Sequence, residues 1–144
     1  MKLAITSGYF NPIHPGHIEC FKLAKEIEGV ARLVVIVNSD SQAELKRGVT
    51  SFQNENDRMK IVESIKWVDE VFLSKDEDLT VRESLRDIII FYQNKNLYSE
   101  ILFVKGGDRF SGNTPEKEIC EELGVTLIDG LGAKTHNSSD YIKK

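Results

Sequence analysis

The chain has 144 residues and a formal net charge of -4. This length suits one domain with a single sizeable core, so we expect residues 1–144 to form one domain. The mixed charges leave no basic stripe for nucleic acid, and no apolar run is long enough to cross a membrane. The first residues lack the basic and apolar regions of a signal peptide, which predicts a cytoplasmic protein.

The first predicted strand, residues 2–6, leads into a turn with the composition of a phosphate site. The turn reads Gly8-Tyr9-Phe10-Asn11-Pro12-Ile13-His14-Pro15-Gly16-His17, and helical spacing follows it. A helix N-terminus has unpaired amides and a dipole that favours an anion. Pro15 suits the first helical position, and Gly16 lets a ligand approach the backbone closely.

His14 and His17 are three residues apart and are therefore expected on one face of the first helical turn. Two imidazoles beside free amides can donate to several oxygens of one phosphate. A single histidine near a turn is more often a surface residue or a hydrogen-bonded core residue. A metal site made of His14, His17 and His136 is disfavoured, because no acidic ligand accompanies them. We therefore predict no metal ligands in the chain.

Helices and strands alternate after this turn. Residues 15–28 have a helical apolar stripe that ends at Gly29, and residues 33–37 form an apolar, largely β-branched run. Such a run is typical of a strand covered on both faces. A strand, a helix and a second strand in this order imply a right-handed crossover and a parallel sheet.

Polar residues follow the second strand directly. Asn38-Ser39-Asp40 lies where ligands gather in open parallel sheets, beyond the carboxyl end of a strand. The same residues favour helix caps and turns, and both roles are compatible. Lys46 and Arg47 beside Gly48 are predicted on a loop, where most such pairs are simply solvated. Their place near the predicted phosphate site favours a contact with substrate.

The next helix is predicted to start at Asn54, with Asp57 as its N3 partner, and to reach about Lys66. Arg58 lies in its first turn, where a cation opposes the helix dipole; this indicates an anionic partner or an acid on a neighbouring turn. The remaining elements are expected at residues 68–73 (strand), 80–94 (helix), 101–104 (strand), 115–123 (helix), 125–128 (strand) and 140–142 (helical turn). This order predicts a Rossmann-like, three-layer α/β/α fold with a parallel sheet of about five strands.

Two later segments have the composition of nucleotide contacts. Lys105-Gly106-Gly107-Asp108 follows a buried strand; paired glycines permit close approach to a flat ligand, and Asp108 can accept hydrogen bonds. A simple turn explains the same residues. Ser138 and Ser139 offer hydroxyls at a helix N-terminus, which can cradle an anion or serve as an ordinary cap. Cys20 and Cys120 lie far apart in helical patterns and are predicted to be reduced core or half-core thiols.

The segment from Gly8 to His17 resembles the G-x-F-[DN]-x-x-H-x-G-H signature of the cytidylyltransferase-like nucleotidyltransferase superfamily, with Asn11 at the Asp-or-Asn position. Within it, the chain looks most like heptose 1-phosphate adenylyltransferases, and it is also similar to glycerol-3-phosphate and phosphoethanolamine cytidylyltransferases. Further matches follow in the expected order along nearly the whole chain: Val37-Asn38-Ser39-Asp40, Leu45-Lys46, Arg58-Met59, Ile61-Val62, Val68-Asp69, Val104-Lys105-Gly106-Gly107-Asp108, Ser138-Ser139 and Ile142.

The resemblance implies a nucleotidyltransferase that moves a nucleoside monophosphate from ATP or CTP to a small phosphate ester, such as heptose 1-phosphate, and releases pyrophosphate. His14 and His17 would bind the triphosphate and stabilise the transition state, and Lys46 would hold the acceptor phosphate. The other nucleotide contacts would be Gly8, Tyr9, Phe10, Asn11, Gly16, Gly107, Asp108, Ser138 and Ser139; the other substrate contacts would be Asn38, Asp40 and Arg58.

Magnesium would arrive with the nucleotide, since the sequence offers no dedicated carboxylate cage. The Lys105-Gly106-Gly107-Asp108 segment favours ATP over CTP by the same resemblance. Relatives are often dimers, which makes a homodimer an expectation for this chain.

Asp140 stands where the closing motif of the family has a third hydroxyl, and the nearest preceding cation, Lys134, is out of register. A carboxylate near a triphosphate repels it unless magnesium or a lysine lies between them. This departure favours one alternative from another class, a nucleotide-binding regulator that keeps the fold without turnover.

Overall fold

The computed structural model describes residues 1–49, 51–106 and 114–131. These residues form a parallel sheet of five strands in the order β3-β2-β1-β4-β5. The strands are β1 (Lys2–Gly8), β2 (Val30–Val37), β3 (Glu70–Leu73), β4 (Glu100–Gly106) and β5 (Thr126–Leu131), and the helices are α1 (Pro15–Glu26), α2 (Asp40–Arg47), α3 (Glu55–Glu63), α4 (Arg82–Lys95) and α5 (Lys117–Leu123). The predicted Rossmann-like fold is confirmed.

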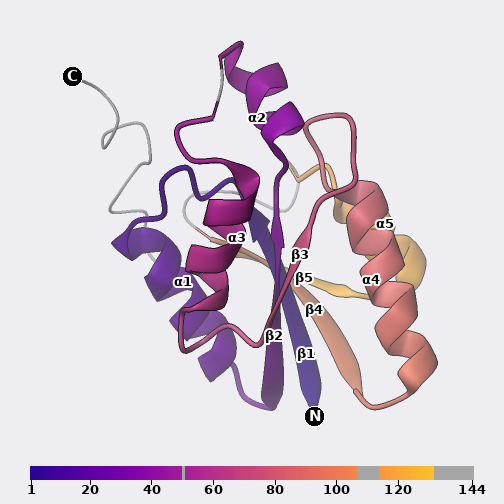
Figure 1. The fold of residues 1–144 in the computed structure, drawn as a ribbon. Helices are drawn as coiled ribbons and strands as arrows, with labels where there is room; N and C mark the ends of the chain where they lie inside the picture. Colours follow the sequence, from indigo (N-terminus) through magenta and orange to yellow (C-terminus); the bar gives the residue numbers. More distant parts are fainter. Residues whose placement is uncertain (50, 107–113, 132–144) are drawn as a thin grey trace.

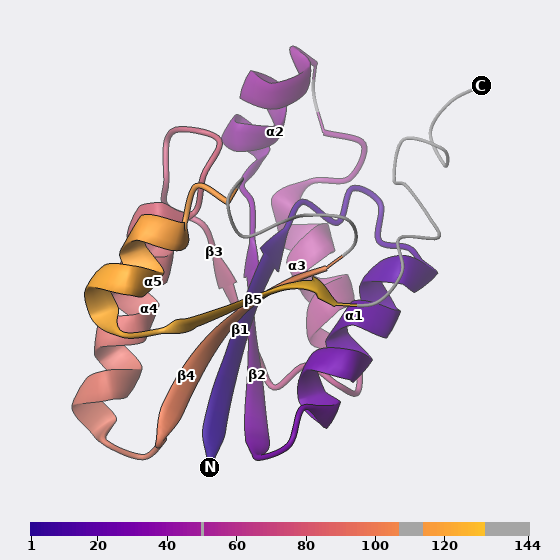
Figure 2. The same ribbon diagram turned by 180° about the vertical axis from the view of Figure 1, so that it is seen from behind.

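Helices cover both faces of the sheet (Figure 1). α1 and α3 lie on one face and α4 and α5 on the other, as the reverse view also shows (Figure 2). Each face has its own core: Phe21 and Val62 pack on the first face, and Leu85 and Ile119 on the second. Residues 33–37 of β2 are completely buried, as expected for a parallel strand between two helical layers.

The order of the strands indicates where in the sheet a ligand site is expected. The chain runs outward from β1 through β2 to β3 and then crosses back to β4, which pairs with β1 on its other side. In open parallel sheets a ligand binds beyond the carboxyl ends of the strands where the order reverses. Here that point lies between β1 and β4, and the turn that carries His14 and His17 follows β1 directly.

The extent of α2 shows that the predicted loop at Lys46 and Arg47 is wrong. Lys46 and Arg47 do not lie on a loop but form the last turn of this helix. Ser39 Oγ accepts the N–H of Gln42 at 3.2 Å, and Gln42 Oε1 accepts the N–H of Ser39 at 3.0 Å. This reciprocal capping box starts the helix, and Gly48, with a φ of 76°, ends it in the left-handed conformation that glycine adopts without strain.

Smaller differences concern the ends of helices. Asn54 caps α3 by accepting the N–H of Asp57, as predicted, but the helix stops at Glu63, before Lys66. The turn expected at residues 140–142 lies outside the described residues. Both cysteines are free thiols, as predicted, with Cys120 buried and Cys20 partly buried. Among the helices of the described ranges, none is long and apolar enough to cross a membrane.

Candidate active site

The turn between β1 and α1 brings both histidines together. Pro15 begins the helix, as predicted, and His14 is its N-cap residue. His14 Nδ1 accepts the N–H of Gly16 at 3.1 Å, and His17 Nδ1 accepts the N–H of His14 at 3.1 Å. The two rings stack, with centroids 3.7 Å apart and 20° between their planes. The expectation that the two imidazoles share one face is confirmed.

These hydrogen bonds determine which ring nitrogen carries the proton. An Nδ1 that accepts an N–H bond uses its lone pair, so in the neutral ring the proton resides on Nε2. His14 and His17 therefore both have Nε2–H as the donor of the ring. Because each of the two stacked rings has its N–H at Nε2, the pair can donate two hydrogen bonds to oxygens of one phosphate group.

The amides at the start of α1 are not unpaired, contrary to our prediction. The N–H of Gly16 is bonded to His14 Nδ1, and the N–H groups of His17 and Ile18 reach the carbonyl of His14 at 2.9 and 3.3 Å. A side-chain cap satisfies donors that a bare helix end would leave open. In this conformation the donor capacity of the turn resides in the imidazoles and not in the amide of Gly16.

Phe10 packs against the ring of His17. Its backbone has a φ of 51° and its side chain is 4% exposed. The Phe10 ring meets His17 edge to face at a centroid distance of 4.9 Å and also contacts Phe21. A Cβ atom at Gly8 would lie only 2.7 Å from Phe10 Cζ, so glycine makes room for this ring. The structure gives Gly8 and Phe10, which we assigned to nucleotide binding, a packing role beside His17.

Arg58 is completely buried, and each nitrogen of its guanidinium donates a hydrogen bond inside the protein. Its Nη1 donates to the carbonyls of Tyr9 and Asn38, each at 2.7 Å, and its Nε donates to the carbonyl of Gln53 at 2.9 Å. Its Nη2 bonds to Asp40 Oδ1 at 2.8 Å. Arg58 is therefore not the substrate contact that we predicted, because its donors are bonded within the fold. The acid that accompanies this cation is Asp40, on a neighbouring helix.

Asn11 and Asn38 also have internal partners. Buried Asn11 accepts the N–H of Gln53 through Oδ1 at 2.9 Å. Buried Asn38 donates from Nδ2 to Gln42 Oε1 at 3.1 Å. Asp40 is 36% exposed. Partial burial raises the pKa of its carboxyl, but hydrogen bonds, first among them the one from Arg58, bring that pKa below its usual value.

Lys46 lies over the turn that carries the histidines. It is exposed in the last turn of α2, and its Nζ is 4.5 Å from the centroid of the Tyr9 ring. A cation in this position is attracted by the electron-rich face of the ring. The fold thus places Lys46 over Tyr9, a residue of the turn that also carries His14 and His17.

The model of the family described as "Cytidylyltransferase-like" matches residues 5–134 of the chain. The chain belongs to this family. This confirms the resemblance that was drawn from the segment between Gly8 and His17 and from the motifs that follow it.

Relatives of this cytidylyltransferase-like chain include FAD synthases of archaea. The FAD synthase of Thermoplasma acidophilum is 37% identical over 91 residues, which is 62% of this chain and 62% of the relative. That of Methanothermus fervidus is 35% identical over 105 residues, covering 67% of this chain and 72% of the relative. The bifunctional protein HldE of Aliarcobacter butzleri is 28% identical over 131 residues, 90% of this chain but only 25% of the relative.

A lipopolysaccharide core biosynthesis protein from Thermoplasma volcanium has the same fold. Its crystal structure superposes with a TM-score of 0.66 at 23% identity and covers 92% of this chain and 98% of that chain. At this identity the similarity concerns the fold alone.

Lys105 is a residue of the site region to which the sequence analysis gave no role. Its Nζ lies 3.3 Å from Ser7 Oγ, at the carboxyl end of β1, and 3.7 Å from Glu116 Oε1. Glu116 is 3% exposed, and its other oxygen accepts the N–H of Val81 at 3.1 Å. The glycines after Lys105 drew attention to this segment, but no sequence pattern links it to Glu116.

The other predicted contacts of the cytidylyltransferase-like chain lie outside the described residues. These are Gly107, Asp108, Ser138 and Ser139. His136, named for the disfavoured metal site, and Lys134 and Asp140, named for the departure from the closing motif of the family, also lie outside the described residues.

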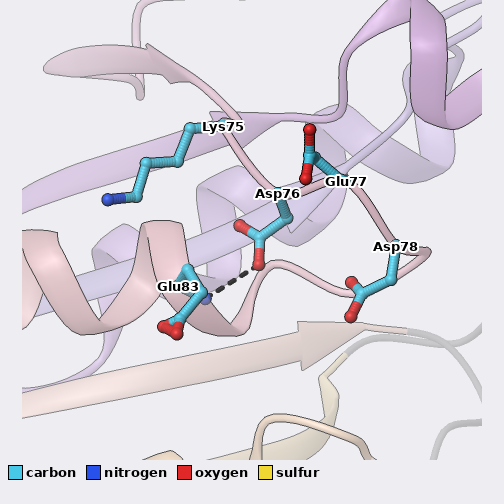
Figure 3. A pocket seen from close by; sticks show the side chains of 5 residues that line it. All are labelled: Lys75, Asp76, Glu77, Asp78 and Glu83. Carbon is cyan, nitrogen blue, oxygen red and sulfur yellow. Dashed lines mark hydrogen bonds between the residues drawn. The ribbon is translucent and has the colours of Figure 1, made fainter.

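A separate hollow of about 670 Å³ lies at the connection between β3 and α4 (Figure 3). It is lined by Lys75, Asp76, Glu77, Asp78 and Glu83. The carboxylate of Asp76 accepts the N–H groups of Glu83 and Ser84 at 2.8 and 2.9 Å and so caps α4. A lining dominated by carboxylates repels phosphates. In the part of the chain that the structure describes, no three His, Cys, Asp or Glu residues are grouped to hold a metal ion.

Proposed function

We propose that this chain is a nucleotidyltransferase that joins a nucleoside monophosphate to a small phosphate ester and releases pyrophosphate. The observation that carries the proposal is the stacked pair of His14 and His17 at the start of α1, with Lys46 over the same turn. Membership in the cytidylyltransferase-like family supports it.

The proposed reaction needs no nucleophilic side chain, because a phosphate monoester with a second pKa of about 6 is itself a nucleophile at neutral pH. One of its oxygens attacks the α-phosphorus of the triphosphate in line. A P–O bond forms there, and the bond to the bridging oxygen breaks, with its electron pair leaving on pyrophosphate. Catalysis then depends on positioning and on neutralising charge.

His14 and His17 would donate from Nε2 to phosphate oxygens on which charge accumulates. Lys46 would hold the phosphate of the acceptor. With no grouped metal ligands among the described residues, magnesium would be held by the triphosphate itself and would neutralise charge on the departing pyrophosphate.

ATP is the triphosphate that the comparisons favour. FAD consists of a flavin phosphate joined to AMP through a pyrophosphate link, which is the bond that the proposed reaction forms from ATP. The FAD synthases of Thermoplasma acidophilum and Methanothermus fervidus are 37% and 35% identical to this chain over the stretches that they match. We infer that the reaction is an adenylyl transfer. One candidate acceptor is a sugar phosphate such as heptose 1-phosphate. The second candidate is flavin mononucleotide, which the relatives named FAD synthase favour.

The test is a panel of four nucleoside triphosphates against phosphate esters, scored for pyrophosphate. The esters include heptose 1-phosphate, flavin mononucleotide, glycerol 3-phosphate and phosphoethanolamine. We expect pyrophosphate only when triphosphate and ester are both present, with one mole of joined product per mole of pyrophosphate. Triphosphate binding without turnover on any ester would instead establish a nucleotide-binding regulator. Sedimentation of the same sample tests the proposed homodimer.

A further inference from the structure

We propose that Arg58 is a positioning residue that fixes the place of Lys46 relative to the turn of His14 and His17. Its loss would weaken the contact with the acceptor phosphate more than the contact with the triphosphate. The kinetic part of this inference rests on the proposed function, whereas its structural part does not.

The guanidinium of Arg58 joins three segments of the chain. Arg58 is 0% exposed and directs hydrogen bonds to the carbonyls of Tyr9, Asn38 and Gln53 and to Asp40 Oδ1, all between 2.7 and 2.9 Å. These acceptors lie on three separate segments: the turn after β1, the junction of β2 with α2, and the loop before α3. A planar group with several fixed donors can join them, but the single ammonium of lysine cannot reproduce those directions.

The bonds of Arg58 also reach the two neighbours that place Lys46, namely α2 and Tyr9. Asp40 is the first residue of α2 and Lys46 lies in its last turn, so a short rigid helix transmits the position of one to the other. The ring that lies under Lys46 Nζ belongs to Tyr9, whose carbonyl Arg58 also holds. Arg58 therefore bonds to Asp40, at the start of the helix that carries Lys46, and also to Tyr9, whose ring lies beneath Lys46 Nζ.

The turn and α2 differ in the hydrogen bonds that would remain without Arg58. The turn has further bonds of its own, because Asn11 accepts the N–H of Gln53 and the two histidines cap α1. The start of α2 is held on its other side by Gln42, whose Nε2 donates to the carbonyls of Asp78 and Thr80 at 2.7 and 2.8 Å. Without Arg58, the turn retains its caps, and α2 retains the bond from the N–H of Asp40 to Glu55 Oε1 at 2.8 Å. α2 then loses the side-chain bond that connects it, through the guanidinium, to the carbonyl of Tyr9.

The structural test is NMR of the Lys46 ε-methylene group, in wild-type protein and in Arg58→Lys. Protons above an aromatic face are shifted upfield, so Lys46 should give a shifted signal that is absent from Lys46→Ala. We expect this shift to decrease by at least half in Arg58→Lys. Arg32→Lys is the matched control: Arg32 bonds to Glu70 and Tyr92 at the start of β2, at the opposite end of the sheet from the turn. An unchanged Lys46 signal in folded Arg58→Lys would overturn the inference.

The kinetic test separates positioning from a merely structural role. In Arg58→Lys we expect the KM for the acceptor to rise about tenfold or more, while the KM for the triphosphate changes by less than about twofold. Adding Lys46→Ala to Arg58→Lys should cost much less than Lys46→Ala alone, because both changes remove the same contact. A lower kcat with both KM values unchanged would mean that Arg58 only maintains the folded fraction, and the inference would be wrong.

Asp40→Asn keeps the inference testable if Arg58→Lys does not fold. It removes the charge of the pair and replaces one acceptor oxygen by an amide donor, while Oδ1 remains to accept from Arg58. We expect a smaller change of the same kind in the Lys46 signal and in the acceptor KM; no change in either contradicts the inference. A wild-type protein that releases no pyrophosphate with any substrate pair would refute the proposed function, and the Lys46 signal would still decide the role of Arg58.

Discussion

His17 Nδ1 accepts the backbone N–H of His14 at 3.1 Å. This bond fixes the orientation of the His17 imidazole, because its donor belongs to the backbone of the turn between β1 and α1. The proposed phosphate site is at the same turn. A donor that is oriented before the reaction does not need to reorganise when charge develops. Because the cap uses Nδ1, the structural and the chemical roles of His17 belong to different nitrogens, and substitutions can separate them.

We expect His17→Asn to lower kcat by about 10²-fold or more, equivalent to ~3 kcal/mol, with little change in triphosphate affinity. Asparagine retains an acceptor near the position of Nδ1 but has no counterpart of Nε2–H. The free energy of unfolding of His17→Asn in urea should therefore stay near that of wild type. His17→Ala also loses the capping hydrogen bond, which should lower that free energy by about 1 kcal/mol. Near wild-type turnover with a collapse of triphosphate affinity would show that His17 has a binding role instead.

Lys46→Ala should raise the KM for the phosphate ester and leave the KM for the triphosphate nearly unchanged. A single contact of this kind contributes roughly 1.5–3 kcal/mol, or about 10- to 150-fold in KM. The matched control is Arg47→Ala, which removes the same charge from the neighbouring exposed position of α2. Steady-state kinetics with each substrate varied in turn measures both effects. An equal loss for the two substrates would contradict the assignment of Lys46.

Gly8→Ala should destabilise the protein by about 1–3 kcal/mol, as overpacking of a core does, because the new Cβ would lie 2.7 Å from Phe10 Cζ. The displaced Phe10 ring would also shift His17, so kcat should fall as well. Urea denaturation measures the first effect. Combining Gly8→Ala with Phe10→Leu should recover part of the loss, since the smaller side chain vacates that space. Strictly additive losses would mean that the two residues do not interact as the structure indicates.

Local signals in the sequence were sufficient for the fold and for the histidine pair. The buried run of β2, the position of Pro15 and the spacing of His14 and His17 all involve residues close in sequence, and the structure confirms each of them. The extent of α2 could have been predicted in the same way. Ser39 and Gln42 form a capping box and Gly48 follows the helix, which is a recognisable start and stop.

The role of Arg58 could not be predicted in this way. Its acceptors include carbonyls of Tyr9 and Asn38, which are far away in sequence, and a backbone carbonyl has no side-chain identity for a sequence to reveal. A cation in the first turn of a helix indicated an anion, and the sequence left open whether that anion was a bound partner or an acid on a neighbouring turn, which the structure identifies as Asp40. The capping of α1 by His14 was missed because histidine is not among the usual N-cap residues.

We expect the proposed enzyme to discriminate between ATP and CTP. The proposed adenylyl transfer and the resemblance of the Lys105-Gly106-Gly107-Asp108 segment both lead us to expect ATP; Gly107 and Asp108 lie outside the described residues. A site that recognises a base edge by buried hydrogen bonds discriminates strongly, because the wrong base leaves polar groups unpaired. We therefore expect ATP to be used at least ~10²-fold better than CTP with the same phosphate ester. The measurement is a competition of the two triphosphates for one accepted ester, with the products separated by mass. A clear preference for CTP would reverse the choice of nucleotide and leave the type of reaction intact, whereas comparable use of both would show that the base is not recognised by buried hydrogen bonds.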